Sequence, residues 1–407
     1  MRFVPLLLAG TMLAAPAFAQ ETAPAESEEQ AQPAAEAPAA AAPSSVHDHA
    51  DEEIVVTGVV RELDILAGKS VISGEELQRD MRVQIGETLT RLPGVSATSF
   101  SPGASRPVLR GFQGERVRVL TDGIGSIDVS NTSADHAVTI DPLTSDRIEV
   151  LRGPAVLLFG SQASGGAVNV IDRRIPRRKP DPFHVDLIGA VGSAADERSI
   201  GGAFDVSLGG NFVLHADGSF RKTDDLRTGG HVLSSQLRAE QLEIAEEELE
   251  EGHVEEAEEA LALADMKGEI PNSATEQKSG GIGLAYIGDK LSLGASVSRF
   301  ESEYGVPMRP GAGHAHGGEG EEEEEHEDVP VSIDLEQTRF DLRGEYAFDT
   351  GFLDRVRLRL GMADYEHTEF EGDEVGTVFK NDGAEGRLEF VQRARNGWSG
   401  ASGIQYF

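Results

Sequence analysis

From residue 183 onward, hydrophobic and polar side chains alternate along the chain in a series of short segments. In the segment RVRLRLGM, Val356, Leu358 and Leu360 share one face of an extended chain, and three arginines occupy the other. A period of two is typical of a β-strand with one face in an apolar environment. The pattern predicts nine strands, near residues 183–191, 199–208, 211–221, 279–287, 291–302, 337–348, 355–366, 384–392 and 399–407.

One face of these strands stays apolar from strand to strand, and the opposite face carries charge. A soluble β-sandwich also alternates, but a repeatedly charged face fits lipid outside and a water-filled lumen inside. Short connections alternate with longer ones near 192–198, 222–277, 303–336 and 368–383, as the periplasmic turns and extracellular loops of outer-membrane barrels do. We therefore expect the first part of an antiparallel transmembrane β-barrel at residues 181–407, with long extracellular loops at 222–277 and 303–336.

The residues before the strands show a mixed pattern that predicts a compact α/β domain at 70–178. The stretch SGEEL, from Ser73, is typical of a helix N-terminus with a capping box. The stretch RVRVLTDGI, from Arg116, alternates as a strand and then turns. A strand, a Gly-Pro break, a Gly/Ser-rich loop and a final strand follow in DRIEVLRGPAVLLFGSQASGGAVNVI.

The N-terminal 58 residues read as an export and tethering region. Residues 1–19 combine one arginine, an apolar stretch and an Ala-Phe-Ala cleavage site, which predicts a secretory signal peptide. Residues 20–51 are rich in Ala, Pro, Glu and Gln, so they cannot bury enough apolar surface to fold and predict a disordered periplasmic linker. The segment EEIVVTG at 52–58 is a short β-branched run, typical of an exposed strand that pairs with a sheet edge.

The overall charge narrows the choice of partners. The chain carries 36 Lys+Arg against 71 Asp+Glu, a formal net charge of -35, so nucleic acid would be repelled and cations attracted. Cys is absent, which excludes disulfides and thiolate metal sites. Any metal must therefore be held by histidine nitrogen and carboxylate oxygen. A further acidic stretch, 237–268, has helical spacing and is expected as a solvated insertion interrupted at Gly252.

Several segments resemble the plug domain of TonB-dependent outer-membrane receptors, in the order in which that family carries them. They are EEIVVTG, LTRLPGVS, RPVLRGF, VRVLTDGI and DRIEVLRGPAVLLFGSQASGGAVNVI, within residues 52–175. The resemblance implies a plug seated inside a barrel of about 22 strands in the outer membrane of a Gram-negative bacterium. Because only nine strands are predicted, we interpret the chain as the N-terminal portion of a longer protein.

The resemblance also implies that 52–58 is the TonB box, which binds the energy-transducing TonB–ExbB–ExbD complex by strand addition. The residues expected to make this contact are Glu53, Ile54, Val55, Val56 and Thr57. Neither H-E-x-x-H nor G-x-S-x-G occurs in the chain, so we expect a receptor embedded in outer-membrane lipid and not an enzyme.

The stretch GAGHAHGGEGEEEEEHEDV, within the second long loop, combines histidines with an acidic run. Imidazole and carboxylate are the ligands that Zn²⁺, Ni²⁺ and Cu²⁺ take when thiolate is absent. A charge run that keeps a long loop soluble is the alternative interpretation. The candidate ligands of this loop are His314, His316, His326, Glu327 and Asp328.

The same loop and the segment DYEHTEFEGDEVGTVFKNDGAEGRLE are similar to the zinc-uptake branch of the receptor family. That resemblance implies a plug ligand pair, matched here by Asp135 and His136, and it makes Glu366 and His367 further candidates. We therefore expect import of a metal cation, with Zn²⁺ as the transported ligand and no cofactor. Receptors for Ni²⁺, Cu²⁺, haem or a siderophore, and a non-transporting surface metal-binding protein, are the alternatives.

Overall fold

The structure is a computed structural model that describes residues 68–307 and 329–407. The predicted signal peptide, linker and TonB box at 1–58 lie outside the described residues, as do all five TonB-contacting residues. The histidine-rich loop lies outside them as well, with its candidate ligands His314, His316, His326, Glu327 and Asp328.

The first part of the described chain is an α/β domain around a five-stranded sheet with the order β1-β6-β7-β4-β5. Its strands are β1 (Ser70–Ser73), β4 (Val117–Thr121), β5 (Ile124–Gly125), β6 (Ser145–Leu151) and β7 (Gly166–Asp172). A ribbon of β2 (Val95–Ala97) and β3 (Pro107–Leu109), the helices α1 (Gly74–Asp80) and α2 (Ile85–Thr88), and four 3-10 turns, η1 (Gly114–Arg116), η2 (Pro142–Thr144), η3 (Gly153–Phe159) and η4 (Ser161–Ala163), complete it.

Apolar side chains of the sheet and of both helices form the core of this domain. Ile72 and Ile148 from neighbouring strands are fully buried, and Leu77 and Ile85 pack on them from α1 and α2. Ser73 precedes α1 as predicted, but its hydroxyl makes no capping hydrogen bond. The capping-box prediction is wrong because the first helical residue is a glycine at φ +54°, so the first turn is irregular.

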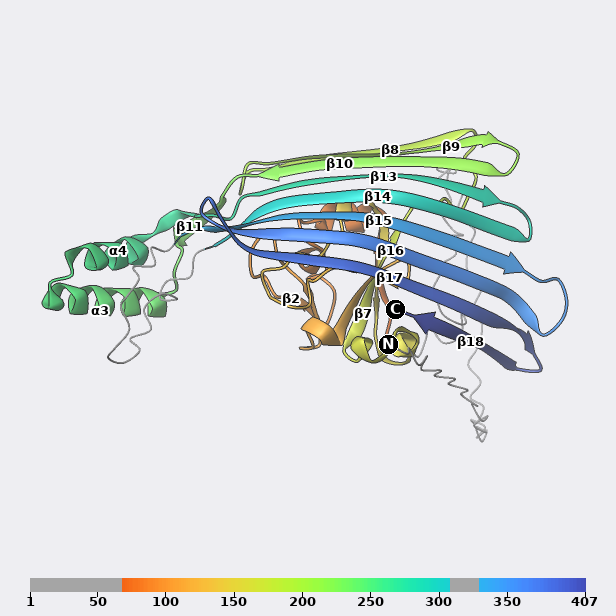
Figure 1. The fold of residues 1–407 in the computed structure, drawn as a ribbon, viewed down its shortest axis with the longest axis horizontal. Helices are drawn as coiled ribbons and strands as arrows, with labels where there is room; N and C mark the ends of the chain where they lie inside the picture. The colour runs from red at the N-terminus through yellow and green to blue at the C-terminus, as the bar shows by residue number, and fades with distance from the viewer. Residues whose placement is uncertain (1–67, 308–328) are drawn as a thin grey trace, which may run out of the picture. The chain divides into compact units, whose positions relative to one another are not determined.

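The second part is one antiparallel sheet of nine strands in the order β8-β9-β10-β13-β14-β15-β16-β17-β18 (Figure 1). The nine strands are β8 (Phe183–Gly192), β9 (Glu197–Gly209), β10 (Phe212–Thr223), β13 (Thr275–Ile287), β14 (Leu291–Val306), β15 (Val331–Ala347), β16 (Leu353–Glu371), β17 (Glu374–Arg395) and β18 (Trp398–Tyr406). An α/β domain followed by nine antiparallel strands confirms the predicted fold class.

β14 illustrates how the alternating sequence divides between the two faces of this sheet. Leu293 and Val297 are about half exposed, at 46% and 50%, whereas Ser296 and Ser298 between and beside them are buried. The buried face lies against the α/β domain, where Arg339 of β15 donates to the Gly125 carbonyl at 2.8 Å. The exposed apolar face is therefore the one available to lipid, as the sequence pattern predicts.

Several strands are longer than the alternation predicts. A loop was expected at 368–383, but β16 continues to Glu371 and β17 begins at Glu374. The predicted ends were wrong because both faces of these outer segments carry polar residues, so the period-two signal fades where the strand no longer borders lipid.

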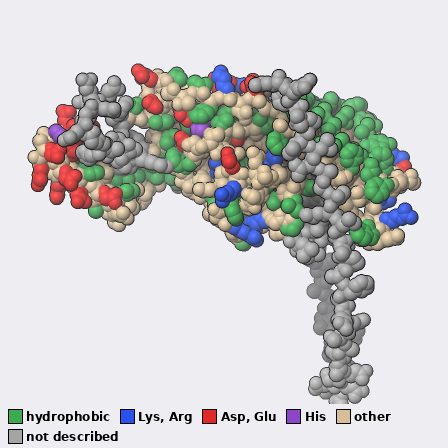
Figure 2. Space-filling view, turned by 60° about the horizontal axis from the view of Figure 1, so that its bottom comes forward, with side chains coloured by type: hydrophobic (Ala, Val, Ile, Leu, Met, Phe, Trp, Pro, Cys, Tyr) green, Lys and Arg blue, Asp and Glu red, His purple; other side chains and the backbone are tan. Residues whose placement is uncertain are grey.

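The acidic stretch forms a two-helix insertion between β10 and β13. Helix α3 (Ser235–Glu251) ends at Gly252, which has φ +94°, and α4 (Val254–Asp265) follows. Two short paired strands, β11 (Leu226–His231) and β12 (Lys267–Ile270), connect it to the sheet. Figure 2 shows its acidic side chains gathered on one outer surface. No helix in the described part of the chain is long and apolar enough to cross a membrane.

Candidate metal-binding site

A loop of the α/β domain, residues 126–141, carries the predicted plug ligands. Asp128 organises this loop, because one carboxylate oxygen accepts from the backbone and hydroxyl of Ser130 and the other accepts from those of Thr139. The two arms of the loop are thereby joined by a partly buried network of charge-assisted hydrogen bonds. The residues between them, including His136, are held against the inner face of the large sheet.

His136 is 2% exposed, and its ring nitrogens face different partners. Nδ1 lies 2.8 Å from the Thr132 hydroxyl and 3.2 Å from the Val129 carbonyl oxygen. Because a carbonyl only accepts, and the Thr132 hydroxyl itself donates to the same carbonyl at 2.7 Å, Nδ1 carries the proton. Nε2 is left to face the large sheet, which is the orientation that a metal ligand requires.

β16 presents three functional side chains to this nitrogen. Tyr365, His367 and Glu369 alternate along the strand and share its inner face. His367 is fully buried, and its Nδ1 lies 2.6 Å from the Tyr365 hydroxyl. Phe379, which pairs with His367 across β16 and β17, packs its ring 4.6 Å from the His367 ring and 4.9 Å from the His136 ring.

His136, His367 and Glu369 meet at one point. The Glu369 Oε1 atom lies 3.1 Å from Nε2 of His136 and 3.4 Å from Nε2 of His367. The two imidazole rings lie edge to face with centroids 4.5 Å apart. Nε2 of His136 therefore points at a carboxylate oxygen, an arrangement that is stable only with a proton or a metal cation between the two atoms.

The spacing of these atoms fits a metal ion. Two ligands bound to tetrahedral zinc at about 2.0–2.1 Å lie about 3.3 Å from each other. The two measured separations, 3.1 and 3.4 Å, bracket that value. Two imidazoles and a carboxylate also form a common ligand set of zinc and of other late first-row metals. We call these three residues the interface cluster, since one belongs to the α/β domain and two to the large sheet.

The other predicted ligands are placed differently. Asp135 is half-buried, and its carboxylate accepts from the hydroxyl of Ser133. Glu366 points to the opposite face of β16 from His367, where it pairs with Lys380 at 2.8 Å. Successive residues of a strand alternate between faces, so Glu366 and His367 cannot reach one ion together.

Glu369 was missed by the sequence analysis. It fell in a segment that was expected to be a loop, so its face was undefined. It lies two positions after His367, and an i, i+2 relation on a strand is the signal that could have found it.

A second group of ligating side chains lies on the two-helix insertion, away from the interface cluster. Glu248 and Glu251 surround His253 at the end of α3, with His253 Nδ1 2.8 Å and 3.9 Å from their carboxylates. The hydrogen bond to Glu248 raises the pKa of His253. Glu251 and His253 are well exposed, and α3 ends between them at Gly252, whose N–H donates to the Glu248 carbonyl.

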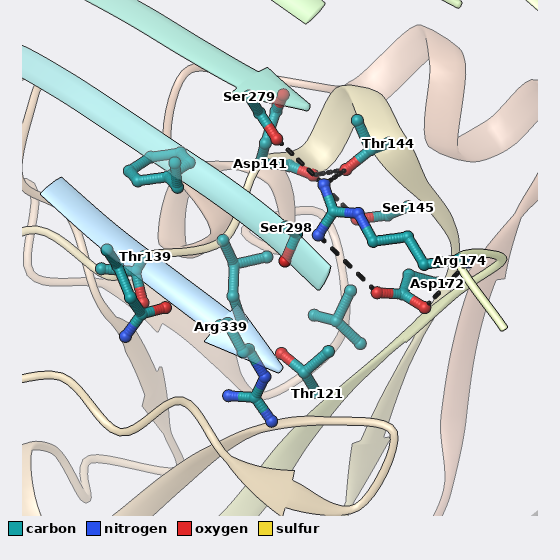
Figure 3. A pocket seen from close by; sticks show the side chains of 14 residues that line it. Thr121, Thr139, Asp141, Thr144, Ser145, Asp172, Arg174, Ser279, Ser298 and Arg339 are labelled. Carbon is teal, nitrogen blue, oxygen red and sulfur yellow. Dashed lines mark hydrogen bonds and ion pairs between the residues drawn. The ribbon is translucent and has the colours of Figure 1, made fainter. Parts of the chain in front are cut away.

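A cavity of about 30 Å³ lies between the α/β domain and the large sheet. Figure 3 shows Arg174 reaching past it to Ser279 of β13, with Asp172 on its other side. This volume is far below the roughly 300–1,000 Å³ of a typical small-molecule pocket.

Comparison with known proteins identifies the α/β domain. Residues 61–167 match the model of the TonB-dependent receptor plug domain. The chain carries a TonB-dependent receptor plug. The rhizobactin receptor of Rhizobium meliloti is 30% identical over 148 residues, 35% of this chain and 19% of that protein. The vitamin B12 transporter BtuB of Photobacterium profundum is 31% identical over 162 residues, 38% of this chain and 26% of that protein.

Solved structures support the whole architecture. The copper transporter OprC superposes with a TM-score of 0.54 at 15% identity, over 81% of this chain and 44% of that one. The ferric yersiniabactin receptor FyuA of Yersinia pestis gives 0.52 at 16% identity, over 81% and 46%. The plug followed by barrel strands is thus the fold of the TonB-dependent receptors, and the chain spans less than half the length of these relatives.

The relatives also bear on two broader predictions. They are named as receptors and transporters, and none of these three is named as an enzyme. Proteins with this plug lie in the outer membrane of Gram-negative bacteria, which confirms the predicted location. The names of the relatives include a siderophore, vitamin B12 and copper, so they do not select zinc.

Proposed function

We propose that the chain is part of a TonB-dependent receptor that imports a divalent transition-metal cation, with zinc as its cargo. The interface cluster is the observation that carries this proposal: the plug supplies His136, and the barrel supplies His367 and Glu369. A cation held there is shared between a part that can move and a part that is fixed. Displacement of the plug then removes a ligand and releases the ion inward.

The donor set and its surroundings favour a bare cation. His136 and His367 are almost fully buried, and Glu369 keeps a side chain exposure of 21%, which leaves a narrow approach. An organic carrier such as a siderophore needs a wide surface of contacts, whereas these three atoms converge on a single point. Zinc, nickel and Cu²⁺ share this ligand preference, so the affinity order among them has to be measured.

The acidic surfaces of the protein support the same direction of transport. The two-helix insertion and the loop 311–329 are rich in carboxylates, and this charge raises the local concentration of cations. The loop joins β14 to β15. The first residue of β15, Val331, pairs with the last residue of β16, Glu371. We propose that its histidines capture zinc first and that the interface cluster receives it.

Zinc accumulation in cells that express the full-length protein tests the proposal. Each of the variants His136→Ala, His367→Ala and Glu369→Gln should reduce accumulation about tenfold or more at low zinc. Glu366→Gln is the matched control, because it removes a neighbouring carboxylate from the opposite face of β16 and should leave uptake unchanged. Uptake that survives all three variants refutes the proposal, and parallel arms with nickel, copper and a ferric siderophore identify another cargo.

A further inference from the structure

Tyr304 of β14 holds the backbone on both sides of His136. Its hydroxyl donates to the carbonyl oxygen of Asp135 at 2.8 Å and accepts from the backbone N–H of Ala137 at 3.0 Å. One barrel side chain thus satisfies the peptide groups that immediately precede and follow the plug histidine. The hydroxyl thus acts as a donor in one hydrogen bond and as an acceptor in the other.

The ring of Tyr304 is held as firmly as its hydroxyl. Tyr304 is 1% exposed and packs among apolar side chains of the plug and of the barrel, including Ala137, Ile333 and Tyr365. Plug residue Gly103 packs directly against the ring, because a Cβ atom at this position would lie 2.4 Å from Cγ of Tyr304. A side chain confined in this way has one rotamer available, so the position of its hydroxyl is fixed.

We propose that Tyr304 is a positioning residue for cargo binding, one that fixes the plug backbone at His136 so that Nε2 meets the barrel ligands. This inference rests on the proposed function. Its two hydrogen bonds go to the main chain of the plug loop, through which it acts on His136. Buried hydrogen bonds that orient a ligand commonly change metal affinity about 10–100-fold when they are removed.

Only a side chain of the barrel can fix the position of His136 relative to the barrel ligands. The Asp128 network and the Thr132 contact shape the plug loop internally, but they do not tie it to β16. Tyr304 stands on a strand separated from β16 only by β15. The hydroxyl therefore fixes the position of His136 relative to the sheet that carries His367 and Glu369.

The test is a double-mutant cycle on the zinc dissociation constant of the full-length protein in detergent, measured by competition with a chromophoric chelator. Tyr304→Phe keeps the ring and removes both hydrogen bonds, and it should weaken zinc binding about 10–100-fold. In a His136→Ala background the same change should have less than about a twofold effect, because the residue it positions is gone. Tyr346→Phe is the matched control, since Tyr346 is 43% exposed on the opposite face of the sheet.

Each outcome decides between the two claims. Unchanged affinity in Tyr304→Phe overturns the inference, while loss in His136→Ala and His367→Ala still supports the proposed function. An equal loss with and without His136 shows a general structural role and also overturns the inference. If neither His136→Ala nor His367→Ala weakens zinc binding, the proposed function fails, and the role of Tyr304 fails with it.

Discussion

Gly283 of β13 lies directly against the backbone that leads from the plug to the barrel. A Cβ atom at this position would stand 1.6 Å from the carbonyl oxygen of Arg174, whereas ordinary contacts begin at 3.4 Å. The Gly283→Ala variant therefore has to displace this backbone by roughly 2 Å, which is a severe case of overpacking. This variant tests whether the backbone at Arg174 packs against Gly283 of β13 in the protein.

The displaced segment has little freedom to move. The Arg174 guanidinium binds Asp217 of β10 at 3.0 Å. It also donates to Ser279 of β13 at 2.9 Å (Figure 3). A shift of its backbone strains both contacts or breaks them. Overpacking of a buried site typically costs about 1–3 kcal/mol, so we expect docking of this segment to weaken by that amount.

A cysteine label measures this loss, because the natural chain contains no cysteine. Ile175 is 3% exposed in the docked state, so Ile175→Cys should react slowly with a maleimide. A cost of about 1–3 kcal/mol predicts roughly 5- to 150-fold faster labelling when Gly283→Ala is added. Gly280→Ala on the same strand is the control, with its nearest neighbour at 3.6 Å. Equal rates of maleimide labelling with Gly283→Ala and with Gly280→Ala would refute close packing of the Arg174 backbone on Gly283.

Two further predictions concern the plug and its energising partner. Burial, followed by the charge of Asp122, raises the pKa of Asp172 to about 6. Because this pKa lies above that of an aspartate in the unfolded chain, ionisation of Asp172 destabilises the fold. The free energy of unfolding of the wild type should therefore fall by about 3 kcal/mol relative to that of Asp172→Asn as the pH rises from 4 to above 6. Melting temperatures that change equally with pH in the two proteins would contradict this. Deletion of residues 52–58 should abolish zinc uptake and leave zinc affinity unchanged. Cell-associated zinc that is the same with and without these residues would instead indicate a surface metal-binding protein without transport.

The sequence carried enough information to predict the large sheet. Lipid on one side and the plug on the other impose a strict period of two, so residues such as Val297 and Ser298 of β14 reveal their faces directly. Beyond the lipid both faces are polar, and the period disappears. For this reason the outer parts of β16 and β17 were assigned to a loop, and Glu369 was overlooked with them.

The candidate site was only partly accessible to sequence reasoning. His136 and His367 were each proposed as ligands, but 231 positions separate them in the chain, and no local pattern says that they meet. Their proximity follows from how the plug seats against the sheet, which depends on close contacts such as Gly103 with Tyr304. The hydroxyl of Tyr304 has no sequence signal at all, because a tyrosine in a strand is ordinarily part of the packing.

Anomalous diffraction at the zinc edge, from crystals of the full-length protein equilibrated with zinc, tests the central claim most directly. We expect a peak about 2.0–2.2 Å from Nε2 of His136, Nε2 of His367 and Oε1 of Glu369. The peak should disappear in crystals of the His136→Ala variant grown under the same conditions. Zinc bound elsewhere, with these three side chains unoccupied and hydrogen-bonded only to one another, would contradict it.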